Sequence, residues 1–165
     1  MKTIKGPGIF LAQFIGGEPP FNTLDGVAQW AVGLGFKALQ LPCNHPAIFD
    51  LAQAAAQGFK LVINNRPDGE DPSQPSSAEI EAAAKAAGLA YVHIPVRGGP
   101  TPDQVEANHR AIEAADGPVL AFCRSGTRSI VTWSLGQFQA DERSADELVE
   151  LGAQAGYDLS GAFPR

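Results

Sequence analysis

The chain has 165 residues, of which 44% are hydrophobic, and this is enough apolar material for one domain with its own core. Its formal net charge is −6 and no basic stripe offsets that charge, so nucleic acid is not an expected partner. No apolar run approaches the length of a membrane-spanning helix, so a membrane is not an expected partner either.

Short apolar runs predict five strands, at Ile9–Phe14, Ala38–Leu41, Leu61–Ile63, Tyr91–Ile94 and Val119–Phe122. Helical patterns lie between these strands and after the last one, at Leu24–Leu34, Ala47–Gln57, Ala78–Ala87, Pro102–Ala115, Gly126–Phe138 and Ala145–Ala155. Strands that alternate with crossover helices form parallel sheets. We therefore expect an α/β fold of three layers, with a mainly parallel five-stranded sheet and helices on both faces.

Three of the predicted helices begin with a capping box. In this motif a hydroxyl side chain and a glutamate or glutamine three residues later satisfy each other's backbone N–H groups. The pairs are Ser76 with Glu79, Thr101 with Gln104, and Ser144 with Glu147. These boxes fix where the three helices start.

The last predicted strand runs directly into the sequence Cys-Arg-Ser-Gly-Thr-Arg-Ser at residues 123–129, and a helix follows. A cysteine between a strand and a helix N-terminus lies in the positive field of that helix, and backbone N–H groups of the turn face the same point. This environment lowers the pKa of a thiol and leaves a reactive thiolate. A lone cysteine is more often a small buried hydrophobe, but packing alone does not require two arginines and two serines after Cys123.

The same turn can hold an anion. Arg128 can grip an anion with two parallel hydrogen bonds, and the remaining contacts would come from Arg124, Ser125, Gly126 and Thr127. Four residues separate Cys123 from Arg128, one fewer than in the loop of cysteine phosphatases. A shorter loop makes a smaller ring of amides, which suits a persulfide sulfur or a small anion better than a tetrahedral phosphoryl group. The loop resembles that of single-domain rhodaneses, in which the cysteine carries transferred sulfur.

Residues 53–165 as a whole resemble the phosphatase-like domain of bacterial beta-lactamase-hydrolase-like proteins. Four motifs carry this resemblance in order: Val62–Glu70, Tyr91–Val96, the cysteine loop and Gly156–Gly161. The family is related to dual-specificity phosphatases, and some of its members are labelled sulfurtransferases. The resemblance implies a phosphatase-like or rhodanese-like fold.

Residues 1–52 resemble a different family, the sugar phosphate isomerase/epimerase barrels, in their opening β-α-β unit. The matching segments are Lys5–Phe14, Pro20–Asp25 and Leu39–Pro42. The remaining chain has no room for the later strands and metal ligands of such a barrel, so we expect no catalytic group in residues 1–52. We interpret the chain as a chimera, natural or engineered, that folds as a single α/β domain over residues 1–165; a divergent N-terminus is the alternative.

Two further residues are candidates for catalysis. Asp68 follows the third predicted strand and could act as a general acid, although Pro-Asp-Gly is equally a common turn sequence. Many dual-specificity phosphatases place their acid just after the strand before the cysteine strand, but the segment Val96–Gly99 has no carboxylate. Ser129 could assist the thiolate as a leaving group.

Other polar residues are weaker candidates. Arg66, Arg97 and Arg124 could widen an anionic funnel around the loop, but each alone is better interpreted as a solvated surface charge. Cys43 and His45 follow the second predicted strand and lack further ligands at a recognisable spacing, so no metal site is expected. Cys43 could act as a resolving thiol.

Three functions remain open at this point. In the leading hypothesis Cys123 takes a sulfane sulfur from thiosulfate or a persulfide and passes it on. The alternative is hydrolysis of phosphoesters through a cysteinyl-phosphate, and the third is a scaffold without turnover that only binds anions. No cofactor is expected. A reactive Cys123 needs a reducing compartment, so we expect a cytoplasmic protein.

Overall fold

The computed structural model describes residues 8–10, 18–20, 22, 26, 29–30, 33, 38–40 and 50–164. The chain divides into two compact units. One consists of residues 50–142, and the other combines the residues before Asp50 with those after Glu142. The cysteine loop lies in the first of these units.

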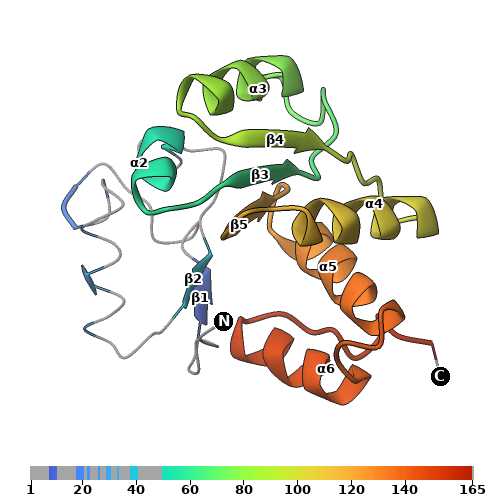
Figure 1. Cartoon of the computed structure of the whole chain (residues 1–165). Coiled ribbons are helices and arrows are strands. Elements are labelled where there is room, and N and C mark those ends of the chain that lie inside the picture. The colour runs from blue at the N-terminus through green and yellow to red at the C-terminus, as the bar shows by residue number, and fades with distance from the viewer. Residues whose placement is uncertain are drawn as a thin grey trace. The chain divides into compact units, whose positions relative to one another are not determined.

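The unit of residues 50–142 contains a three-stranded parallel sheet in the order β4-β3-β5 (Figure 1). The strands are β3 (Leu61–Asn64), β4 (Ala90–His93) and β5 (Val119–Phe122). The central strand β3 is buried along its whole length, as expected for a strand with neighbours on both edges and helices over the sheet. Because the strands are parallel, all three carboxyl ends lie at the same edge of the sheet.

Four helices belong to this unit: α2 (Leu51–Ala56), α3 (Ser77–Ala86), α4 (Pro102–Glu113) and α5 (Thr127–Gln139). Figure 1 shows α3 alongside β4, and α4 together with α5. Leu61 and Ile63 project from one face of β3 and form a core cluster with Ile94, against which Ala107 and Ala111 of α4 pack. This packing fixes β3 and thereby the position of the loop that follows it.

The second unit contains β1 (Gly8–Phe10) and β2 (Ala38–Gln40), which pair in parallel. It also contains α6 (Ala145–Gln154), which begins at the capping box of Ser144 and Glu147. Leu159 folds back against Gly152 of this helix so closely that a Cβ on Gly152 would lie 2.6 Å from Leu159 Cδ1. Only glycine therefore allows this close approach.

The predicted elements of residues 50–142 agree with the structure to within a few residues, and all three capping boxes are present. The prediction of one five-stranded sheet is wrong for the described residues, because β1 and β2 form a separate two-stranded sheet. Apolar periodicity marks a strand but carries no information about its partners. None of the described helices has the length and apolarity needed to cross a membrane.

Candidate active site

The cysteine loop lies at the carboxyl end of β5, where Phe122 leads into Cys123 and α5 starts four residues later. Gly126, the residue before α5, has φ 87° in the left-handed region, which a residue with a side chain rarely adopts. This conformation turns the Gly126 N–H back onto the Cys123 sulfur at 3.1 Å. The hydroxyls of Ser125 and Thr127 lie 3.2 Å apart and tie the outside of the loop together.

Two opposing effects act on the thiol of Cys123, which is 1% exposed. Burial raises its pKa, but the backbone N–H groups of Ser129, Ser125, Arg128 and Gly126 all point at the sulfur, and together they hold the pKa below its ordinary value. The ring of amides therefore favours the thiolate, which is the nucleophilic form.

Thiolate formation at Cys123 is expected at a lower pH than at an ordinary cysteine, whose pKa is about 8.5. Ultraviolet thiolate absorbance, recorded as a function of pH, measures this midpoint. The Cys123→Ser variant provides the matched blank, because it retains Cys43 as the other cysteine. A difference titration with its midpoint at or above the ordinary value would remove the thiolate from the proposed chemistry.

Arg128 is held by a carboxylate that the sequence analysis did not single out. Its Nη1 and Nη2 atoms donate to Oε1 and Oε2 of Glu70 at 2.6 and 2.9 Å, and Nη1 also donates to the Val96 carbonyl oxygen at 2.8 Å. Arg66 Nε donates to the same carboxylate at 3.2 Å. Glu70 thus joins two arginines beside the loop, and their hydrogen bonds and charge lower its pKa despite partial burial.

This arrangement decides which edge of Arg128 remains for a ligand. Glu70 and Val96 occupy both hydrogens of Nη1 and one of Nη2, so the Nε–H and the second Nη2–H remain. These two point in parallel from one side of the guanidinium and match two oxygens of an anion. The same guanidinium interacts with the Cys123 sulfur. The free edge of Arg128 and the amide ring therefore serve one anion site.

The end of β3 supports this site with buried polar groups. The Asn64 side chain donates to the Tyr91 hydroxyl at 2.9 Å and accepts from the Arg66 N–H at 2.9 Å. Asn65 donates to the Ile94 carbonyl at 3.1 Å, and His93 Nε2 lies 2.9 Å from the Arg66 carbonyl. These bonds join the loops after β3 and β4. Arg66 is 5% exposed, so its interpretation as a solvated surface charge is wrong.

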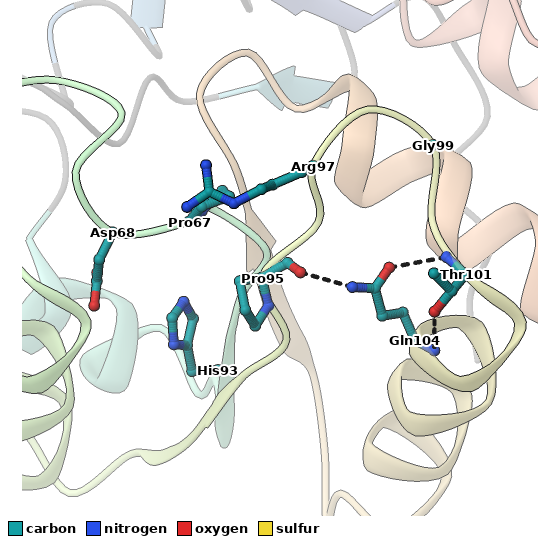
Figure 2. Close-up of a pocket in the computed structure, with 8 residues that line it drawn as sticks. All are labelled: Pro67, Asp68, His93, Pro95, Arg97, Gly99, Thr101 and Gln104. Carbon is teal, nitrogen blue, oxygen red and sulfur yellow. Dashed lines mark hydrogen bonds between the residues drawn. The ribbon is translucent and has the colours of Figure 1, made fainter.

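An open pocket of about 350 Å³ lies at the same edge of the sheet (Figure 2). Its lining includes Asp68, His93 and Arg97 together with Pro67 and Pro95. Both Asp68 oxygens accept hydrogen bonds at 2.7 Å, one from the backbone N–H and one from the hydroxyl of Ser77, the first residue of α3. The hydroxyl bond is the main cause of the lowered pKa of Asp68.

The predicted site residues thus separate into three groups. Cys123, Ser125, Gly126, Arg128 and Ser129 meet around the sulfur. Ser125 contributes only its backbone N–H, since Arg124, Ser125 and Thr127 are all exposed, and Asp68 lines the neighbouring pocket. The Ser129 hydroxyl is buried without a hydrogen-bond partner among the described residues. Cys43 and His45 lie outside the described residues.

One cluster of metal-ligating side chains was also not anticipated. His109, Glu113 and Glu142 bring three ligand atoms within 4.8 Å of one another. Both glutamates are exposed, and exposed carboxylates commonly lie close together without an ion. We assign no metal to this cluster.

Comparison with protein families identifies the domain. Residues 41–140 match the family model described as beta-lactamase hydrolase-like protein, phosphatase-like domain. The chain belongs to this family. The match includes the loop after β3, the cysteine loop and helix α5.

Two curated relatives support the assignment. A beta-lactamase hydrolase-like protein of Agrobacterium fabrum is 40% identical over 123 residues, and one of Xylella fastidiosa is 41% identical over 120 residues. Each alignment covers 72% of this chain but only 28% of the relative. The chain therefore spans little more than a quarter of the length of these relatives.

Solved structures show the same fold. A Neisseria meningitidis protein provisionally named as a phosphatase is 37% identical, with a TM-score of 0.59 over 67% of this chain and 78% of its own. A Shewanella putrefaciens protein of the same provisional name is 24% identical, with a TM-score of 0.52 over 63% of this chain and 64% of its own. The phosphatase-like fold is therefore established, whereas the barrel origin predicted for residues 1–52 gains no support from these comparisons.

Proposed function

We propose that this phosphatase-like domain hydrolyses phosphate monoesters through a cysteinyl-phosphate on Cys123. The observation that carries the proposal is the anion site, in which amides of the loop and the free edge of Arg128 converge on one sulfur. Family membership favours this chemistry over sulfur transfer, which led the sequence-based hypotheses. The substrate is a small anionic ester.

In the first step the Cys123 thiolate forms a sulfur–phosphorus bond as the phosphorus–oxygen ester bond breaks. The developing charge on the phosphoryl oxygens is stabilised by the loop amides and by Arg128, which Glu70 holds in place. In the second step water attacks phosphorus, phosphate leaves, and Cys123 returns as a thiolate. The Ser129 hydroxyl, which has no other partner in the described chain, can then donate a hydrogen bond to the sulfur.

Asp68 is our candidate for the acid that protonates the leaving alcohol, because it is the carboxylate of the pocket beside the loop. Its lowered pKa keeps Asp68 ionised at neutral pH. A bound phosphate dianion nearby would raise that pKa, because like charges disfavour ionisation. In the second step the Asp68 carboxylate would accept the proton of the attacking water.

Sulfur transfer is a second candidate, because the ionised state of Asp68 suits a reaction that needs no general acid. With thiosulfate, Cys123 would take the outer sulfur as a persulfide, and sulfite would leave without needing a proton. Asp68 is tied to Ser77 and ionised, which suits a reaction without a general acid. The four-residue spacing between Cys123 and Arg128 also suits the smaller group.

Mass spectrometry of Cys123 after brief reaction with phenyl phosphate or with thiosulfate separates the candidates. We expect a phosphate adduct and turnover of phenyl phosphate, both lost in Cys123→Ser. Asp68→Asn should slow phenyl phosphate more than para-nitrophenyl phosphate, whose leaving group needs less protonation. A sulfur adduct without phosphatase activity would reverse the order of the two reactions. Reversible phosphate binding without either adduct would leave only an anion-binding scaffold.

A further inference from the structure

Two residues that bind Arg128 are close in sequence to residues that line the pocket. Val96 lies between the pocket residues Pro95 and Arg97, and its carbonyl oxygen accepts from Arg128 Nη1 at 2.8 Å. Glu70, which binds the same guanidinium, lies two residues after the pocket residue Asp68. The two segments that line the pocket therefore also hold Arg128, while no residue of the cysteine loop itself lines the pocket.

Most polar groups of the pocket are already engaged. Gln104 donates from Nε2 to the Pro95 carbonyl and accepts at Oε1 from the Thr101 N–H, both at 2.8 Å (Figure 2). His93 Nε2 is bonded to a backbone carbonyl, and both oxygens of Asp68 are bonded to Ser77. The exposed ring of Pro95 offers apolar surface for a flat group, whereas Pro67 is buried.

Arg97 differs from these residues. It lines the pocket, is exposed, and makes neither a hydrogen bond nor an ion pair with any residue that the structure describes. Lys85 and Arg110 are exposed as well but pair with Glu81 and Glu106, each one helical turn away. Lys60 and Arg124 are exposed and, like Arg97, form no ion pair with a described residue, but neither lines the pocket. The guanidinium of Arg97 therefore keeps its full set of donors for a ligand.

The charges around the pocket also favour an anion on the Arg97 side. Figure 2 shows the Arg97 guanidinium next to Pro67 at the top of the pocket, Asp68 at the left, and His93 below them on the Asp68 side. The Asp68 carboxylate repels a second anion from its own side, whereas Arg97 offers a planar fork that matches a carboxylate. The pocket therefore has a cationic part at Arg97 and an anionic part at Asp68.

We propose that Arg97 binds a carboxylate on the organic part of the substrate, so that the domain selects aryl phosphates that carry a second anionic group. The phosphoryl group lies in the Cys123 loop, the ring lies against the exposed Pro95, and the carboxylate meets the Arg97 fork. This assignment rests on the proposed phosphatase function and adds the substrate class to it. Arg97 is then a residue that determines specificity.

A pair of probes with similar leaving groups tests the selectivity. Para-carboxymethylphenyl phosphate differs from phenyl phosphate chiefly by the added carboxylate. We expect kcat/KM to be about tenfold higher for the carboxylate probe, as one charge-assisted hydrogen-bonded pair implies. Arg97→Gln should bring the ratio of the two kcat/KM values close to unity, whereas the matched surface variant Arg110→Gln should keep it. An unchanged ratio in Arg97→Gln would overturn the assignment.

Binding to the inactive Cys123→Ser variant gives a measurement that does not depend on turnover. Calorimetry should show tighter binding of the carboxylate probe than of phenyl phosphate, and the difference should vanish when Arg97→Gln is added. If this pattern appears while the wild type turns over neither probe, the proposed function fails and the pocket assignment stands. If the wild type turns over both probes but Cys123→Ser binds them equally, the function stands and the pocket assignment fails.

Discussion

Replacement of Arg128 with lysine is expected to lower kcat/KM for phenyl phosphate by about a thousandfold, with Cys123 still reactive. The removal of one preorganised donor from a developing anion costs about 10²–10³ in rate, and lysine also cannot reproduce the side-on fork. The loss should appear mainly in kcat, because the interaction strengthens as charge develops on the phosphoryl oxygens. Steady-state kinetics on the purified variant measure it.

The lysine variant needs a control for folding, because Arg128 also anchors two loops. Its guanidinium bonds to Glu70 and to the Val96 carbonyl, which belong to the segments after β3 and β4. Arg110→Lys changes the same residue type on an exposed face of α4 and should leave the rate and the melting temperature unchanged. If Arg128→Lys melts like the wild type and loses less than tenfold in kcat/KM, Arg128 does not stabilise the transition state.

Local patterns in the sequence predicted most of what surrounds Cys123. The strand Val119–Phe122, the turn and the helix after it are contiguous, so the position of the thiol at a helix N-terminus follows from neighbouring residues alone. The capping boxes are similarly local, because both partners lie within three residues. The amides around the sulfur come from the same seven-residue stretch, which explains why the cradle could be predicted.

Glu70 could not be predicted in the same way. Its partner Arg128 lies 58 residues along the chain, and only the parallel pairing of β3 with β5 brings the two loops together. A glutamate in a Pro-, Asp- and Gly-rich loop looks like a solvent-exposed charge. Arg66 was misinterpreted for the same reason, because its burial depends on Glu70. The useful signal is an acid placed after one parallel strand and an arginine placed after its neighbour, since both strands end at one edge.

The five-stranded sheet failed for a related reason. The strand patterns at Gly8–Phe10 and Ala38–Gln40 are present and parallel, but their partners are each other. Sheet membership depends on long-range contacts, and a strand of three residues carries too little information to specify them. The active-site prediction did not depend on this error, because the site requires only the carboxyl ends of β3, β4 and β5.

Replacement of Glu70 with glutamine is expected to lower kcat/KM for phenyl phosphate by about a hundredfold while making Cys123 more acidic. An amide offers one acceptor in place of two, and its NH₂ group faces the donors of Arg128, so the free edge of the guanidinium loses its orientation. The lost negative charge also leaves Arg128, which interacts with the sulfur, without its neutralising carboxylate, and added positive charge lowers a thiol pKa. At a given pH the thiolate absorbance of the variant should therefore be higher than that of the wild type, while its kcat/KM should be lower.

The melting temperature of the Glu70→Gln variant as a function of pH is a third measurement, and the direction of its difference from the wild type can be predicted. The folded-state pKa of Glu70 is lowered by the hydrogen bonds from Arg128 and then Arg66, so its ionised form contributes stability above the ordinary glutamate pKa of 4.5. This contribution is lost as pH falls below 4.5 through the lowered value. The wild type should thus melt higher than Glu70→Gln at neutral pH, and the gap should narrow under acid conditions. A merely structural role would lower the melting temperature and the rate without making Cys123 more acidic. That outcome would contradict the assignment of Glu70 as the residue that positions Arg128 for the anion.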